Sequence, residues 1–342
     1  MDDIIIPFDR ALELSKEDKR TILLGNGFSR SIWKDFNYDS LYEVSEKQAQ
    51  KKKPKKWKYL KKLFQKLETT DFEKVLHYLN ITITVLENYE KNEGLIKLLT
   101  SDQSQAKESL LSAIEQIHPK FKQIIKEYQF INIIEFLSNF NQIFTINYDL
   151  LLYWIIMESI QSKKIRIPRN DGFFIDKESN NLIWDLMSPK TPSQNVFYLH
   201  GNFFITDEEP IQKIIHKGPD NKILDQLKDL LDNERLPLVV LEGKDKKIEK
   251  IINHSYFLYC LYSLIQTEGN LFLLGVSLNN DNHLVKAIKK SKVKKIFVGY
   301  HEKLTDEFRD KTMPLSISEG QNREIYYFDS FEVTKLWKSS DV

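Results

Sequence analysis

Short apolar runs alternate along this chain with segments of helical spacing. The first run, residues 21–24, ends at a glycine turn and predicts a buried strand. From residue 141 onward the runs recur, and we expect strands at 142–146, 195–199, 236–241, 270–276, 295–300 and 324–328. Helical spacing is predicted between them, over 149–160 and from near 281. Strands that alternate with helices predict an α/β fold, a Rossmann-like parallel sheet with helices on both faces.

A long block between the first strand and the later ones has a different pattern. Thr70 and Glu73 have the spacing of a capping box, and apolar positions at helical spacing follow from Phe72. Helical patterns continue with interruptions to about residue 140. We therefore expect one domain over residues 1–342 that carries a mostly helical insertion over residues 42–140.

Composition narrows the class of protein. The 342 residues suffice for a sizeable core, and 50 basic residues nearly balance 49 acidic ones, so net charge gives no argument for nucleic acid. A single cysteine, Cys260, excludes an internal disulfide and a four-cysteine zinc site. The start lacks a signal-peptide pattern, and the apolar run at 150–156 is too short to span a bilayer. We expect a soluble cytoplasmic protein with no membrane or nucleic-acid partner.

Glycine turns follow two of the predicted strands. The first is Gly25-Asn26-Gly27-Phe28-Ser29, which joins a strand to a helix, and the second contains Gly275 and Ser277. Ligands of doubly wound sheets bind at the carboxyl ends of the strands, and glycine lets the backbone approach a diphosphate. Short glycine turns are also common without a ligand, so each turn alone is weak evidence.

Polar residues capable of chemistry follow two other strands. Asn147 offers amide donors and an acceptor for ribose hydroxyls or a reacting water, whereas Asp149 fits a helix N-cap as well as a functional role. His200, followed by Gly201, ends an apolar strand and has the chemistry of a general base near neutral pH. We set the other six histidines aside. For Asp281 we favour an N-cap over ligand contact.

Taken in order, these segments resemble the sirtuin superfamily. Its G-x-G-x-S loop, T-x-N-x-D segment, histidine-glycine pair and G-x-S turn all occur here in that order, at Gly25–Ser29, Thr145–Asp149, His200-Gly201 and Gly275–Ser277. The match is closer to a bacterial sirtuin-like family, whose pattern also includes Thr70–Glu73, Glu242-Gly243 and Lys247. Two sirtuin features are absent, namely the four-cysteine zinc module and the G-x-P-D-F-R segment. Their absence argues against lysine deacylation.

The resemblance implies a sirtuin-like fold that binds NAD and cleaves the bond between nicotinamide and ribose, without a metal. It implies Asn147, His200 and Asp149 as catalytic residues. It implies cofactor contacts from Gly25, Asn26, Gly27, Phe28, Ser29, Gly275 and Ser277. Related bacterial proteins hydrolyse NAD in defence against phage, which implies a regulated effector, a homo-oligomer, and a HerA-like ATPase or another defence component as partner. A non-catalytic NAD or ADP-ribose sensor and an ADP-ribosyltransferase remain as alternatives.

Overall fold

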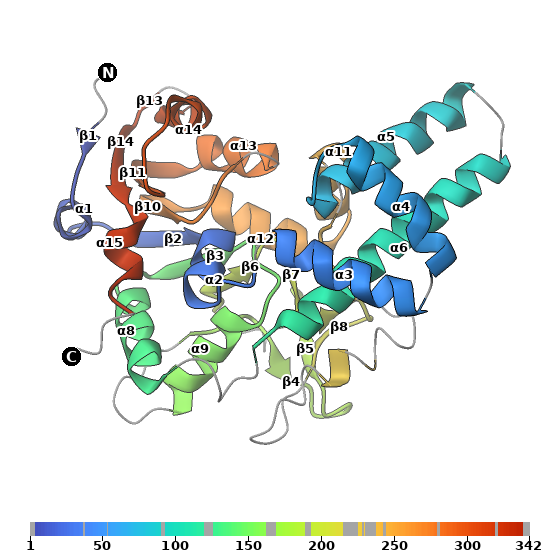
Figure 1. Ribbon diagram of the computed structural model, residues 1–342. Coiled ribbons are helices and arrows are strands. Elements are labelled where there is room, and N and C mark those ends of the chain that lie inside the picture. The colour runs from blue at the N-terminus through green and yellow to red at the C-terminus, as the bar shows by residue number, and fades with distance from the viewer. Residues whose placement is uncertain are drawn as a thin grey trace.

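The computed structural model describes residues 4–36, 38–52, 54–89, 93–119, 126–161, 169–188, 193–214, 225–227, 229, 237–241, 244–278, 281–318 and 321–337. Figure 1 shows helices on both sides of a central sheet, and a group of helices that projects away from it. Among the described helices, none is long and apolar enough to cross a membrane.

The central sheet is parallel throughout. Its seven strands run in the order β1-β14-β11-β10-β2-β3-β6, and every neighbouring pair is parallel. The strands are β1 (Ile4–Ile5), β2 (Arg20–Leu24), β3 (Gln142–Thr145), β6 (Val196–Tyr198), β10 (Glu268–Leu274), β11 (Lys292–Tyr300) and β14 (Glu324–Asp329). Numbered along the chain from β2, the six longer strands follow the order 3-2-1-4-5-6 of a doubly wound Rossmann sheet. The predicted fold class is confirmed.

Both faces of this sheet are buried under helices. On one face Phe197 stacks on Phe144 at 4.5 Å between ring centroids and approaches Tyr259 of α12 (Ser255–Ile265). On the other, Phe272 packs edge-on against Phe140, just beyond the end of α8 (Glu127–Ser138). A strand buried on both sides has apolar residues at consecutive positions, which explains why the strands appear as continuous apolar runs.

Further helices complete the layers. They are α1 (Phe8–Leu14), α2 (Asn26–Ile32), α9 (Leu151–Gln161), α11 (Lys244–Ile252), α13 (Asn282–Lys290), α14 (Asp306–Thr312), the 3-10 turn η1 (Met313–Ser316) and α15 (Ser330–Thr334). A small hairpin of β12 (Ile317–Ser318) and β13 (Gln321–Asn322) lies between η1 and β14.

The prediction that residues 236–241 form a strand of the parallel sheet was wrong. That strand, β9 (Pro237–Val239), belongs to a separate sheet of order β4-β5-β8-β7-β9, in which all pairs are antiparallel. Its other strands are β4 (Phe174–Ile175), β5 (Leu182–Trp184), β7 (Gly201–Thr206) and β8 (Ile211–Lys213). A short apolar run indicates a buried strand but neither its partner nor its direction, and so the pattern alone did not reveal this second sheet.

The described residues between α2 and β3 form only helices. These are α3 (Tyr38–Lys52), α4 (Pro54–Lys66), α5 (Phe72–Tyr89), α6 (Glu93–Ile117) and α8. Helix α6 packs against α3, α4 and α5, whereas α8 packs against α9 beside the sheet. Figure 1 shows α5 and α6 extending away from the sheet. We call α3 to α6 the helical block, and we propose that it folds as an insertion into the domain.

The start of α5 differs from the predicted capping box. The carboxylate of Asp71 accepts the backbone N–H of Glu73 at 2.8 Å and that of Lys74 at 3.4 Å, so Asp71 caps the helix. The Glu73 side chain bonds to Lys247 instead of to the backbone at the cap.

The turn from β6 into β7 depends on one glycine. Gly201 has a φ of +78°, and a Cβ there would come within 1.9 Å of the Leu238 carbonyl oxygen. We predict that Gly201→Ala lowers the free energy of unfolding by about 2 kcal/mol or more, because both backbone strain and the clash oppose it. Urea denaturation measures this, and an unchanged midpoint would contradict the described turn.

Candidate functional site

The two predicted glycine turns pack directly on each other. The Gly25 N–H donates to the Leu274 carbonyl, and the Gly27 N–H donates to the Gly275 carbonyl, both at 3.0 Å. A Cβ on Gly25 would meet the Gly275 oxygen at 2.4 Å, and a Cβ on Gly275 would meet the Phe28 nitrogen at 2.5 Å. The glycines are therefore needed for the close approach of the ends of β2 and β10, before any ligand is considered.

Three polar side chains lock the end of β3 to the first turn. The Asn147 amide donates to the Gly25 carbonyl at 2.8 Å and to the Ser29 hydroxyl at 2.9 Å. The Ser29 hydroxyl in turn donates to the Asp149 carboxylate at 2.5 Å. The other Asp149 oxygen accepts the Leu151 N–H at 2.8 Å, which fixes the chain at the start of α9. Burial raises the pKa of Asp149, and the Ser29 hydroxyl opposes that shift.

The remaining residues predicted at the glycine turns are placed differently. Asn26 donates its amide to the Phe36 carbonyl at 3.2 Å. The Phe28 ring is buried and packs edge-on against Trp337, at 5.9 Å between centroids. Ser277 is exposed to solvent. Of the seven predicted cofactor contacts, Ser277 therefore has the freest side chain, and those of Phe28 and Ser29 serve packing and internal hydrogen bonds.

The structure brings Asn147 and His200 to the same edge of the sheet. Thr145 and Tyr198 are register partners in neighbouring parallel strands, and each of the two polar residues follows two positions later. Hydrogen bonds continue across the two segments beyond the strands. The Phe203 N–H donates to the Tyr148 carbonyl at 3.1 Å, and the Asn202 amide to the Asp149 carbonyl at 2.7 Å.

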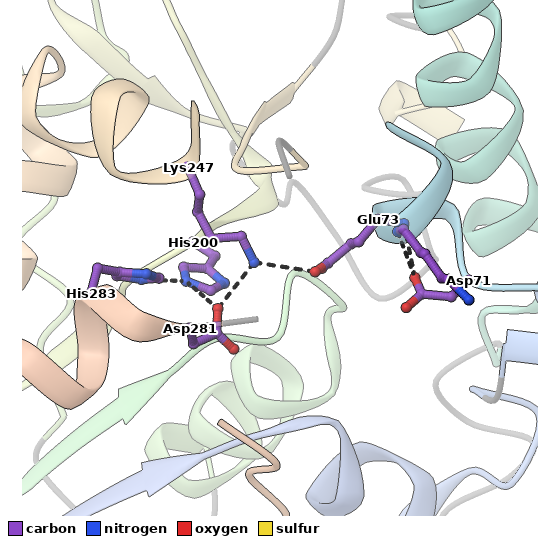
Figure 2. Close-up of polar contacts among 7 residues, drawn as sticks. Asp71, Glu73, His200, Lys247, Asp281 and His283 are labelled. Atoms are coloured by element: carbon purple, nitrogen blue, oxygen red, sulfur yellow. Dashed lines mark hydrogen bonds and ion pairs between the residues drawn. The ribbon is translucent and has the colours of Figure 1, made fainter. Parts of the chain in front are cut away.

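His200 lies in a buried network that the sequence did not predict (Figure 2). Its Nε2 lies 3.0 Å from Nε2 of His283 and 3.7 Å from Oδ1 of Asp281. The same Asp281 oxygen lies 3.0 Å from the Lys247 ammonium, which is also 3.2 Å from a carboxylate oxygen of Glu73. The network thus joins β6, α13 and α11 to the start of α5 in the helical block.

Burial and charge set the protonation of this network. Burial, reinforced by the Lys247 charge, lowers the pKa of His200 well below its usual value, so the imidazole is neutral at pH 7. Burial would lower the pKa of Lys247, but Glu73 and Asp281 raise it, so the ammonium stays charged. Burial would raise the pKa of Asp281; the facing His200 and Lys247 lower it, and the net shift is downward. Because His200 is neutral, we attribute the lowered pKa of Asp281 to the Lys247 ammonium.

Two of our interpretations change here. Asp281 occupies the N-cap position of α13, but its side chain makes no cap hydrogen bond and binds Lys247 instead. His283, set aside with the other histidines, lies against His200. Its position two residues after Asp281, at the start of a helix that follows a glycine turn, was the available signal. Glu242 and Gly243 lie outside the described residues.

His200, Asp281 and His283 also have donor atoms within 4.8 Å of one another, which is close enough to share a metal ion. Two imidazoles and a carboxylate suit zinc or iron. However, Asp281 already binds the Lys247 ammonium, whose charge repels a cation. The contacts of these residues describe a hydrogen-bonded ion-pair network.

Another buried histidine, His118, follows the last residue of α6 and contacts the segment next to Asp149. Its Nε2 accepts the Leu150 N–H at 3.0 Å, and its Nδ1 lies 3.1 Å from the Pro119 carbonyl. These partners fix a neutral tautomer with the proton on Nδ1. Burial lowers the pKa of His118 to about 3, so its role here is structural.

We predict that Lys247→Met destabilises the protein by about 3 to 5 kcal/mol at pH 7, because Glu73 and Asp281 lose their shared cation while buried. Denaturant unfolding measures the loss. The triple variant Glu73→Gln, Lys247→Met, Asp281→Asn removes the two negative charges as well and should recover part of it. Equal stability of Lys247→Met and wild type would contradict the described network.

His118 predicts a dependence of stability on pH. The unfolded chain protonates this imidazole below about pH 6.5, whereas the folded chain resists protonation down to about pH 3. Stability attributable to His118 is therefore lost as the pH falls from 6.5, by up to about 1.4 kcal/mol per pH unit. The free energy of unfolding of wild type should fall more steeply from pH 7 to 5 than that of His118→Gln. Parallel curves would contradict this.

Comparison with known proteins adds a family. Among solved structures, a mutant Sir2 homologue in complex with 2'-O-acetyl ADP-ribose is similar at 12% sequence identity and a TM-score of 0.30, over 96% of this chain and 93% of that chain. A TM-score this low does not establish a common fold. No curated protein matches the chain. The family described as "Domain of unknown function (DUF4917)" matches residues 22–337, nearly the whole length, and the chain belongs to that family.

Proposed function

We propose that this protein is an NAD glycohydrolase, which converts NAD and water to nicotinamide, ADP-ribose and a proton. The observation that carries the proposal is the strand order. In a sheet of order 3-2-1-4-5-6, dinucleotides bind where the order reverses, which here is between β2 and β10. Both glycine turns, Gly25–Ser29 and Gly275–Ser277, lie at that point.

Backbone groups of the two turns would hold the diphosphate and the neighbouring ribose. Their glycines let the two turns pack against each other, which brings these backbone groups together at one point. The exposed Ser277 hydroxyl would add a donor, and so would the backbone N–H of Asn26 at the start of α2. The N–H groups of Gly25, Gly27 and Phe28 already donate to carbonyls of the two strand ends. The Ser29 hydroxyl donates to Asp149 and accepts from Asn147, so Ser29 would hold the turn in shape and would not contact the ligand through its side chain.

Nicotinamide in NAD is a cationic leaving group and needs little acid assistance. As it departs, the ribose carbon becomes oxocarbenium-like, and the enzyme must present one oriented water. Both amide hydrogens of Asn147 are already donated to Gly25 and Ser29, so its Oδ1 is the side-chain atom that would accept from that water or from a ribose hydroxyl. Asp149 would hold this arrangement in place through Ser29.

His200 would accept the proton that the water or a ribose hydroxyl loses. Its imidazole is neutral at pH 7, as a general base must be. Its place beside Asn147, across the β3–β6 register, supports the assignment of both residues to one reaction.

We further propose that the NAD-cleaving activity is regulated, because uncontrolled loss of NAD harms a cell. A role as an anti-phage effector, in which NAD cleavage is released by a partner or by oligomerisation, would follow from that chemistry. A HerA-like ATPase is one candidate partner, and depletion of cellular NAD during phage infection would test the role.

Purified protein incubated with NAD should release nicotinamide and ADP-ribose in equal amounts, measured by liquid chromatography. His200→Gln and Asn147→Ala should each lower the rate by about a hundredfold or more. His301 is exposed to solvent, so His301→Gln is the matched control and should keep the wild-type rate.

A second pair of variants tests the binding point. Gly275 and Gly269 both have positive φ and close backbone neighbours, but they lie at opposite ends of β10. Alanine at either position strains the strand end, and only Gly275→Ala should weaken NAD binding measured by calorimetry.

NAD binding without cleavage, even in the presence of candidate partners, would favour a sensor over an enzyme. Absence of any NAD binding would refute the proposal.

A further inference from the structure

The contacts of the His200 ring fall on one nitrogen atom. Nε2 of His200 lies 3.0 Å from Nε2 of His283 and 3.7 Å from Oδ1 of Asp281. Two neutral imidazoles at this distance share one proton, so that one nitrogen donates and the other accepts. Either His200 donates to His283, or the reverse.

Asp281 decides between these arrangements. Its oxygen faces Nε2 of His200, and a carboxylate favours an N–H in front of it over a lone pair. Almost no solvent screens that preference, because His200 is 2% exposed and Asp281 is 7% exposed. The ammonium of Lys247 on the same oxygen keeps Asp281 in its charged form. Nε2 of His200 is therefore the donor.

We propose that Asp281 and His283 hold His200 in the tautomer protonated on Nε2, so that Nδ1 is the nitrogen that takes the proton in the reaction. Lys247 and Glu73 hold Asp281 in place for this purpose. The inference deepens the proposed function and rests on it for the role of Nδ1. His283, Asp281, Lys247 and Glu73 are positioning residues, because they act through His200.

The charges of the network fit this proton transfer. Burial raises the pKa of Glu73, and the Lys247 ammonium opposes that shift. With Glu73 and Asp281 both ionised against this ammonium, the three groups together carry one net negative charge. When an O–H bond of the water or ribose hydroxyl breaks and an Nδ1–H bond forms, His200 becomes an imidazolium. The network is then neutral, and the Asp281 carboxylate that fixes the tautomer also stabilises the protonated ring against burial and the Lys247 charge, which both disfavour it.

The tautomer can be measured without any substrate. In ¹⁵N-histidine-labelled protein at pH 7, long-range ¹H–¹⁵N correlation distinguishes the two neutral forms, and signals that vanish in His200→Gln and in His283→Gln identify the two rings. We expect His200 with its proton on Nε2 and His283 with its proton on Nδ1. A proton on Nδ1 of His200 would overturn the proposal.

Asp281→Asn keeps the shape of the side chain and removes its charge. It should lower kcat for NAD cleavage by about a hundredfold or more with little change in KM, and should shift the His200 tautomer. Glu73→Gln should lower kcat by about tenfold or less, since it acts one contact further away. The control is Asp207→Asn, because Asp207 pairs with His254 at 3.0 Å in a similar contact near the surface. It should leave kcat unchanged.

The failures of the two proposals are distinguishable. Without NAD cleavage but with the expected tautomer, the positioning network stands and the enzymatic function fails. NAD cleavage that Asp281→Asn leaves intact overturns the network and not the function. Stoichiometric binding of Zn²⁺, measured by calorimetry and lost in His200→Gln and His283→Gln, would overturn the shared proton in favour of a shared metal.

Discussion

The buried ammonium of Lys247 connects the helical block to the start of α13, two parts of the protein that lie far apart in the sequence. Lys247 is 1% exposed, and its two partners come from the helical block and from the start of α13. A charge so deeply buried is tolerated only while both carboxylates face it. The placement of α5 relative to the sheet, the ionisation of Asp281 and the environment of His200 therefore depend on the same contact.

The glycine turns place a second constraint on the same edge of the sheet. They let β2 and β10 end in direct backbone contact, and Asn147 then ties β3 to that contact through the Gly25 carbonyl. The polar side chains of the site are thus held by hydrogen bonds to backbone as well as to each other. Such an edge is organised before a ligand binds, which lowers the entropic cost of orienting one.

The sequence predicted those parts of the fold that have local signals. The parallel strands other than β1 were predicted because burial on both faces gives unbroken apolar runs, and glycine turns marked the ends of two of them. The second sheet was not predicted, because the apolar run around Leu238 contains nothing that identifies β7 as its partner. The residues at strand ends were likewise found from sequence, since parallel strands place their carboxyl ends at one edge.

Local patterns did not predict the network around His200, although the family resemblance had marked the segment that ends at Glu73 and also Lys247. Glu73, Lys247 and His283 lie far apart in the sequence, and no periodicity relates them. Asp281 was interpreted as a cap because caps are the commoner use of aspartate before a helix. Only tertiary packing shows that its carboxylate bonds to a lysine from another helix and not to its own helix.

The passage of β6 into β7 through His200 and Gly201 has a consequence for how the family could diversify. Most strands of an α/β sheet end in a loop, and loops are where specificity changes most easily. Here the chain enters the antiparallel sheet at once, and Val240 already bonds to the His200 carbonyl. That strand end offers one imidazole and no adjustable loop. Under the proposed function, new substrate preferences would have to arise in the elements that contact the network of His200, among them the helical block, whose Glu73 bonds to Lys247.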